Sequence, residues 1–124
     1  MAELLADSYA FTAHFEGNPR YVRIFSTARI HTTAMNVVEI HSTLLRRLDP
    51  EKARQFSGLA LAKVIDVPLE VAIRAAEFKR KMALQKLNCS HIDAWGYCAA
   101  QALGLKFLTG DPVFKGLENV EFVR

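Results

Sequence analysis

Four acidic side chains of this chain have the types and positions that could do chemistry. They are Asp7, Glu39, Asp93 and Asp111. Two of them follow apolar runs typical of buried strands, one opens a predicted helix, and one lies within another. Because open parallel sheets bind ligands at the carboxyl ends of their strands, we expect these carboxylates to converge on one edge. Carboxylates gathered there repel one another unless a divalent cation joins them. The pattern therefore predicts a metal-dependent phosphodiesterase site.

Each carboxylate also has a structural interpretation. Asp7 and Asp111 precede predicted helical turns, where Asp is a common N-cap residue. Asp93 follows Ser90 at the spacing of a capping box, with Asp93 reaching back to the Ser90 amide. Glu39 lies on a helix expected to be mostly buried, where Glu is rare unless paired or bound to metal. Helix N-termini at a shared edge would help to hold the anions, so the combination favours a common site.

Strands and helices alternate along the chain, which predicts an α/β fold with a mostly parallel central sheet and helices on both faces. Short apolar or β-branched runs indicate four or five short strands, and periodic apolar spacing indicates the helices. The strands are expected at 3–7, 30–33, 64–67, 105–109 and 120–123, and the helices at 8–15, 19–28, 34–48, 50–63, 69–86 and 90–103.

Length and composition indicate one soluble domain over residues 1–124. The chain is 51% hydrophobic and 23% charged, as is ordinary for a globular protein. It contains no long apolar run and no secretory signal, and its two cysteines are too few for a disulfide framework. We expect a cytoplasmic protein that does not associate with a membrane.

A basic strip lies on the predicted helix 69–86 and gives that segment a net charge equal to the +3 of the whole chain. Such a strip suits a polyanionic partner such as RNA, but a solvated helix face would explain it as well. The RNA-contacting candidates in this strip are Lys79, Arg80, Lys81 and Lys86.

Other groups offer weaker alternatives. Cys89, His91 and Cys98 could suggest zinc, but their number and spacing do not suit a zinc site. The aromatic side chains of the C-terminal third could stack unpaired bases, although core packing is the favoured interpretation. These aromatic residues are Trp95, Tyr97 and Phe114.

Taken together, the motifs resemble those of PIN-domain ribonucleases over nearly the whole chain. The family pattern has Asp at the end of the first strand with Ser or Thr beside it, a Glu on a mid-chain helix, Asp-Ala at a helix start, and Thr-x-Asp-x-x-Phe after a late strand. The matching segments are Asp7-Ser8, Glu39, Asp93-Ala94 and Thr109–Phe114, while Tyr9 departs from the pattern. The short length is similar to that of VapC-like toxins of toxin–antitoxin pairs.

The resemblance implies a three-layer PIN-like fold and Mg²⁺- or Mn²⁺-dependent endonuclease cleavage of RNA. Asp7, Asp93 and Asp111 would be metal ligands, with Glu39 as a further ligand or as the residue that orients the water. The hydroxyls of Ser8 and Thr109 would support them. An antitoxin protein and a second copy of the chain are the implied partners. The apolar residues expected at the dimer surface are Phe15, Tyr21, Phe25, Leu44 and Phe56.

Three alternatives stay open at this point. A PIN-like module could bind RNA or protein without cleaving, and an RNA-processing nuclease could share the site without belonging to a toxin system. A phospho-acceptor receiver domain has similar length and alternation, but it needs an acidic pair after its first strand. The sequence Ala6-Asp7-Ser8 offers only one acidic residue there.

Overall fold

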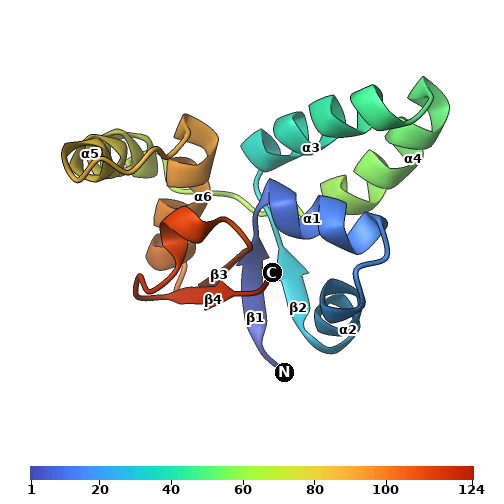
Figure 1. Ribbon diagram of the computed structural model, residues 1–124, viewed down its shortest axis with the longest axis horizontal. Helices are drawn as coiled ribbons and strands as arrows, with labels where there is room; N and C mark the ends of the chain where they lie inside the picture. The colour runs from blue at the N-terminus through green and yellow to red at the C-terminus, as the bar shows by residue number, and fades with distance from the viewer.

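A four-stranded parallel sheet forms the centre of the molecule (Figure 1). The computed structural model describes residues 1–124. The strand order is β2-β1-β3-β4, and every neighbouring pair is parallel. In the register, Leu5 of β1 lies opposite His31 of β2 and Phe107 of β3. The strands are β1 (Glu3–Ala6), β2 (Arg29–His31), β3 (Lys106–Thr109) and β4 (Val120–Phe122).

Six α-helices and one short 3₁₀ turn connect the strands, and most begin at residues that the sequence marks as caps. Thr33, Asp49 and Ser90 each accept a hydrogen bond from a backbone N–H of the helix that follows. The helices are α1 (Ser8–Phe15), α2 (Pro19–Thr27), α3 (Ala34–Arg47), α4 (Pro50–Leu61), α5 (Val71–Leu84) and α6 (His91–Ala102), with the 3₁₀ turn η1 at Pro112–Phe114.

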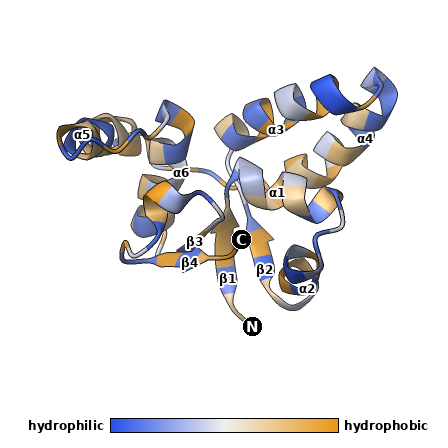
Figure 2. Ribbon diagram, viewed as in Figure 1, coloured by the Kyte–Doolittle hydropathy of each residue, from blue (hydrophilic) through white to orange (hydrophobic).

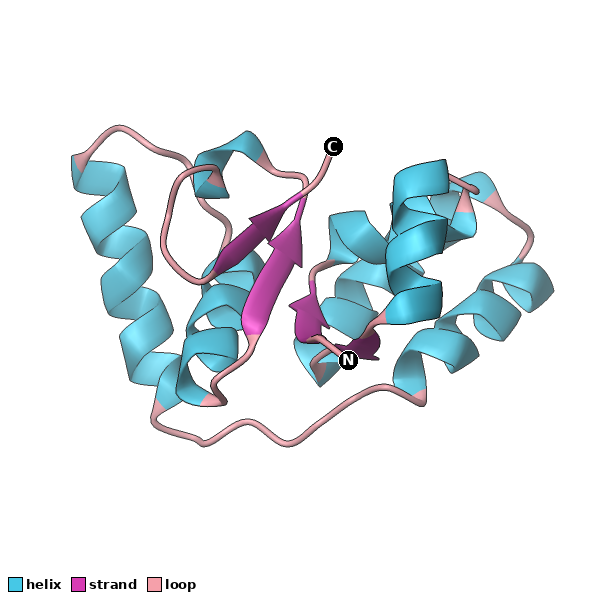
Figure 3. Cartoon of the chain, turned by 90° about the horizontal axis from the view of Figure 1, so that it is seen from below, coloured by secondary structure: helices cyan, strands magenta, loops and turns pink.

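The sheet is buried on both faces between two groups of helices (Figure 3). Side chains alternate along each strand, so Leu5 and Phe107 point to the core formed with α5 and α6. Leu4 and Leu108 point to the opposite core, formed with α1 to α4. Burial on both faces explains the apolar runs Leu4-Leu5-Ala6 of β1 and Phe107-Leu108 of β3, and Figure 2 shows the arrowhead end of β1 in orange. The expected three-layer α/β fold is confirmed.

One expected strand is wrong. The segment 64–67 forms only an isolated parallel bridge between Val64 and Thr32, supported by the hydrogen bond from the Ile65 N–H to the Thr32 carbonyl. The chain then leaves the sheet and runs as a long connection to α5 on the other face (Figure 3). Because it must cross between the two layers, it cannot stay paired. No helix is long and apolar enough to cross a membrane.

Two of the five residues expected at a dimer surface are instead in the core. Tyr21 is fully buried and donates its hydroxyl to the Val123 carbonyl, and Leu44 is 4% exposed. Their apolar area is covered within the chain, because α2 and α3 pack against the same core as the sheet. Phe15, Phe25 and Phe56 are only partly buried.

Candidate active site

The four carboxylates line one cleft at the carboxyl ends of β1 and β3. The cleft has a volume of about 320 Å³ and is here named the carboxylate cleft. Its sequence-predicted members come from four different places in the chain: the end of β1, the middle of α3, the first turn of α6 and the end of β3. The eight residues that line it are Asp7, Tyr9, Glu39, Asp93, Gly110, Asp111, Pro112 and Arg124.

Asp7 lies deepest in the cleft and is 2% exposed. It caps α1, because one carboxylate oxygen accepts a 2.8 Å hydrogen bond from the Ala10 N–H. The other oxygen accepts a hydrogen bond from the Thr109 hydroxyl. The structural and chemical interpretations of this residue are therefore compatible: the bonds that make Asp7 a cap also fix the position of its carboxylate.

Thr109 links the ends of β1 and β3. Its hydroxyl donates to Asp7 and accepts a 3.0 Å hydrogen bond from the Asp111 N–H. Asp111 in turn accepts from the Val113 N–H at 3.0 Å and so caps the short turn η1. One hydroxyl thus holds two of the four acidic residues in a fixed relation.

Asp93 and Glu39 reach the carboxylate cleft from the helices α6 and α3, respectively. The Ser90 hydroxyl accepts a 3.1 Å hydrogen bond from the Asp93 N–H, which fixes the first turn of α6. Glu39 is half-buried on α3 and its carboxylate makes no hydrogen bond within the chain. It is consequently the least constrained carboxylate of the cleft.

Burial and mutual repulsion perturb two of the carboxylates. Burial raises the pKa of Asp7 to about 7, against the hydrogen bonds from Thr109 and Ala10, and the charges of Asp93 and Asp111 raise it further. Burial also raises the pKa of Asp93 to about 6, with the negative charge of Glu39 as the next cause. Asp7 and Asp93 therefore take up a proton more readily than ordinary aspartates do.

This donor set suits a hard divalent cation, because Mg²⁺ and Mn²⁺ prefer oxygen ligands. As the side chains stand, no three His, Cys, Asp or Glu residues are close enough together to hold one ion. Asp7, Asp93 and Asp111 would be the residues that hold such an ion, with Glu39 beside them in the cleft. The observation that fits a cation is the gathering of these carboxylates in one cleft, where their mutual repulsion adds to the effect of burial in raising the pKa of Asp7 and Asp93.

The Ser8 hydroxyl, expected to support the carboxylates, contacts Asn36 at the start of α3 and not the Asp7 carboxylate. Its hydroxyl donates to the Asn36 carbonyl at 3.4 Å, and the Asn36 amide lies 3.5 Å from the Ser8 oxygen. Asn36 is fully buried and also accepts a 2.7 Å hydrogen bond from the Thr33 hydroxyl. This polar network joins α1 to the start of α3, one turn before Glu39. Asn36 was not among the site residues predicted from the sequence.

Two further residues that line the cleft were missed from the sequence. Arg124 follows β4, and its guanidinium donates a 2.8 Å hydrogen bond to the Gly110 carbonyl. The Arg124 guanidinium also lies over the ring of Tyr9, the residue that departs from the family pattern. The guanidinium carbon is 5.7 Å from the centroid of that ring. The signal for Arg124 was its place after a last strand that could pair beside β3.

The other sequence candidates lie outside the cleft. None of the basic residues of α5 and the turn after it lines the cleft, and Lys79 is tied to the Cys89 carbonyl at 2.6 Å. Arg80, Lys81 and Lys86 are exposed, so their contact with RNA stays a prediction. Phe114 and Tyr97 are buried in the core, as are the free cysteines Cys89 and Cys98.

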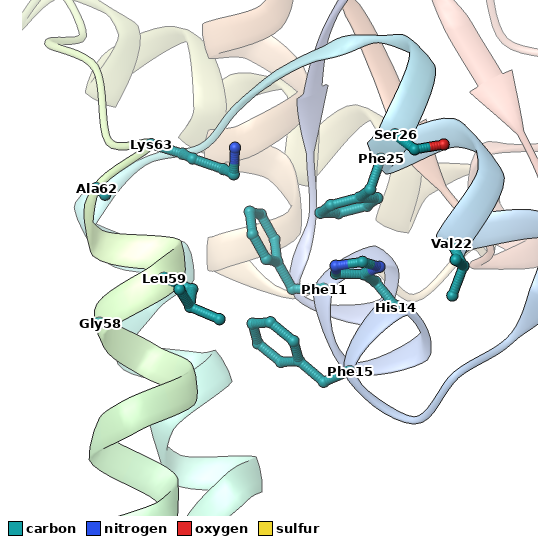
Figure 4. A pocket seen from close by; sticks show the side chains of 10 residues that line it. All are labelled: Phe11, His14, Phe15, Val22, Phe25, Ser26, Gly58, Leu59, Ala62 and Lys63. Carbon is teal, nitrogen blue, oxygen red and sulfur yellow. The ribbon is translucent and has the colours of Figure 1, made fainter.

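A second hollow, here named the aromatic pocket, lies between α1, α2 and α4 and has a volume of about 520 Å³. The rings of Phe11, Phe15, Phe25 and His14 gather in it (Figure 4). His14 stacks on Phe25 with ring centroids 4.1 Å apart, and burial lowers the pKa of His14. The ten residues that line it are Phe11, His14, Phe15, Val22, Phe25, Ser26, Gly58, Leu59, Ala62 and Lys63.

Comparison with known proteins assigns the family. The model of the PIN domain matches residues 4–119, so this chain belongs to the PIN domain family. No curated protein sequence matches the chain.

Solved structures share the fold at low sequence identity. VapBC2 from Rickettsia felis, bound to a DNA fragment from its promoter, has a TM-score of 0.75 at 13% identity over 98% of this chain and 97% of that chain. A toxin–antitoxin complex from Klebsiella pneumoniae has a TM-score of 0.72 at 17% identity over 95% of each chain. The sarcin-ricin loop cleaving toxin VapC20 from Mycobacterium tuberculosis has a TM-score of 0.74 at 18% identity over 94% of this chain and 98% of that chain.

Proposed function

We propose that this protein is a metal-dependent endoribonuclease and the toxin of a type II toxin–antitoxin pair. The observation that carries the proposal is the carboxylate cleft, in which four acidic side chains from separate elements share one hollow. The fold similarity to VapC20, which is described as a sarcin-ricin loop cleaving toxin, supports RNA as the substrate class. We also propose that the protein works in the cytoplasm, where it would meet such an RNA substrate.

Mg²⁺, with Mn²⁺ as a substitute, is the proposed cofactor, and Asp7, Asp93 and Asp111 are its proposed ligands. When bound, such an ion lowers the pKa of a water and stabilises negative charge on the leaving oxygen. The Ala10 N–H and the Thr109 hydroxyl hold the carboxylate of Asp7 in place for this role. Glu39, which has no hydrogen-bond partner, is free to orient the attacking water or to complete the ligand set.

A cleavage assay tests the proposed activity. Structured RNA is incubated with the protein in Mg²⁺ or in EDTA, and the products are resolved by length. We expect internal cleavage in Mg²⁺ and none in EDTA. RNA that is bound but left intact at every Mg²⁺ or Mn²⁺ concentration would contradict the proposal and favour a PIN-like binding module.

An antitoxin is the second proposed partner, in line with the toxin–antitoxin complex among the structural relatives. We assign its docking surface to the aromatic pocket, where Val22 is 42% and Leu59 is 58% exposed at the rim. A partner's apolar side chains would cover these rings. The neighbouring reading frame is the place to find this partner, and an RNA-processing nuclease outside a toxin system would lack it.

A homodimer is the third element of the proposal. Large apolar side chains remain exposed on α3 and α5, among them Val38 at 56% and Ile73 at 68%. A smaller apolar hollow of about 200 Å³ is lined by Met35 of α3 together with residues of α5 and α6, among them Ile92. A second copy would cover this surface, and a monomer mass in sedimentation at micromolar concentration would contradict the assignment.

A further inference from the structure

Arg124 is the only basic residue that lines the carboxylate cleft. Its guanidinium donates to the Gly110 carbonyl at 2.8 Å and lies 5.7 Å from the centroid of the Tyr9 ring. Cation–π contact and a hydrogen bond together restrict a side chain that would otherwise be mobile. A single positive charge is thus held among four carboxylates.

Three hydrogen bonds to two other elements, β3 and α2, fix the backbone that carries Arg124. The Val123 N–H donates to the Thr109 carbonyl at 3.0 Å, which continues the pairing of β4 with β3. Tyr21 of α2 donates its hydroxyl to the Val123 carbonyl, and Arg20 donates to the Arg124 carbonyl at 3.2 Å. The backbone position from which the Arg124 side chain starts is therefore specified by the fold.

Gly110 makes this close approach feasible. A Cβ at this position would lie 2.2 Å from a ring carbon of Tyr9 and 2.7 Å from the Val123 carbonyl oxygen. Any side chain there would displace the tyrosine ring or the strand that leads to Arg124. The glycine between Thr109 and Asp111 thus lets Tyr9 and Arg124 reach the cleft.

Arg124 forms no ion pair within the chain. The ion pairs of the structure join Glu3 to Arg29 and His31, and Glu16 to Arg47. A guanidinium carries five N–H donors, and the hydrogen bond to Gly110 occupies one of them. The remaining donors have the fork geometry that binds phosphate oxygens, and their positive charge offsets part of the repulsion that a phosphate meets from the carboxylates.

We propose that Arg124 forms a phosphate-binding site at the wall of the carboxylate cleft, where it holds a phosphate of the RNA backbone beside the metal-binding carboxylates. This inference rests on the proposed ribonuclease function. In this arrangement the carboxylates bind the cation and Arg124 binds the substrate anion.

Binding of RNA in EDTA tests the contact without cleavage. The affinity of the full chain for a labelled single-stranded oligoribonucleotide is measured by fluorescence anisotropy over a series of salt concentrations. Each phosphate contact contributes about 0.7 to the slope of log affinity against log salt for a single strand. Arg124→Ala should lower the slope by about 0.7, and Arg124→Lys should restore it.

Arg29→Ala is the matched control, because it removes one exposed arginine at the opposite, amino-terminal end of the sheet. We expect it to leave the slope unchanged. A slope for Arg124→Ala equal to that of the parent, or an equal fall for Arg29→Ala, would overturn the phosphate site.

Cleavage in Mg²⁺ provides the second readout. Arg124→Ala should lower kcat/KM by about tenfold or more, the scale of a lost charge-assisted hydrogen bond, and Arg124→Lys should recover part of it. Suppose that the parent cleaves RNA and that the Arg124→Ala variant matches it in both kcat/KM and salt slope. This result would overturn the phosphate site and leave the proposed ribonuclease function standing. A parent that does not cleave in any metal would overturn the proposed function, whereas a lowered salt slope would still support the contact.

Discussion

The carboxylate cleft and the aromatic pocket are both lined by residues at or near α1, but they differ in the chemistry of their side chains and in the contacts that hold those side chains. Asp7 and Tyr9 at the start of α1 line the cleft, while Phe11 and Phe15 further along the same helix line the pocket. Hydrogen bonds and caps fix the positions of the groups in the cleft. In the pocket the contacts are ring on ring, as between His14 and Phe25.

Under the proposed function, this contrast would separate the site of chemistry from the surface for a partner. Helix N-termini at the sheet edge supply N–H donors and so collect carboxylates, which suits the binding of a cation and a phosphate. The later turns of the same elements carry the apolar area that a protein partner can bury.

The largest effect should come from removing one charge in the cleft. Asp93→Asn should reduce RNA cleavage in Mg²⁺ by about a hundredfold or more, because a metal ligand supplies several kcal/mol of transition-state stabilisation. It should leave binding of the antitoxin unchanged. The measurement is kcat/KM beside a titration with the product of the neighbouring reading frame. Parental cleavage by this variant would remove Asp93 from the site.

A change in the aromatic pocket should weaken antitoxin binding and leave RNA cleavage unchanged, the reverse of the result expected for Asp93→Asn. Leu59→Glu places a charge at the pocket rim and should weaken antitoxin binding by about thirtyfold or more, the scale of a lost hot-spot residue. Cleavage by the free protein should stay at the parental rate. Leu61→Glu is the control, since Leu61 is 60% exposed on the same helix but does not line the pocket. Equal weakening by both variants would show that the pocket is not the docking surface.

Most of the fold was predictable from local sequence, because apolar periodicity and Asp-Pro or Ser caps mark the ends of the elements within a few residues. The strand at 64–67 failed because local pattern does not show that the chain must leave the sheet to reach α5. Asp7 and Asp111 were predictable from strand ends, Asp93 from a helix start and Glu39 from its place on a helix expected to be buried, but Arg124 was not predicted. Its place depends on the pairing of β4 with β3, and the apolar run before Arg124 indicates a last strand without showing which strand it pairs with.

A third prediction concerns the pH dependence of stability without metal. Because the pKa of Asp7 is raised from 3.8 to about 7, the folded protein keeps a proton that the unfolded chain loses near pH 4. The free energy of unfolding in EDTA should therefore fall as pH rises from 4 to 7, by about 2 kcal/mol or more relative to Asp7→Asn. Urea unfolding of both proteins across this range measures it. A difference that stays constant with pH would show that Asp7 ionises normally.

The smallest expected effect concerns the basic strip on α5 and the turn after it. If the exposed Lys81 and Lys86 contact RNA outside the cleft, replacing both with Ala should lower the salt slope of RNA binding by about 1.4 in total. The rate of cleavage at saturating RNA should not change. An unaltered slope would leave this strip as a solvated helix face and confine phosphate contacts to the cleft side of the molecule.

Asp111→Asn compared with Asp49→Asn is the most direct test of the carboxylate cleft as a metal site. Both residues are Asp-Pro caps that accept a hydrogen bond from a backbone N–H, and Asn caps about as well as Asp, so neither change should lower stability in EDTA. Only Asp111 lines the cleft.

The measurement is cleavage of RNA in Mg²⁺ together with the stability that Mg²⁺ adds. The parent and Asp49→Asn should cleave equally and should gain about 2.7 kcal/mol at a hundredfold excess of metal over its dissociation constant. Asp111→Asn should lose cleavage and gain less stability from the metal. Cleavage by Asp111→Asn at the parental rate would contradict the four-carboxylate site.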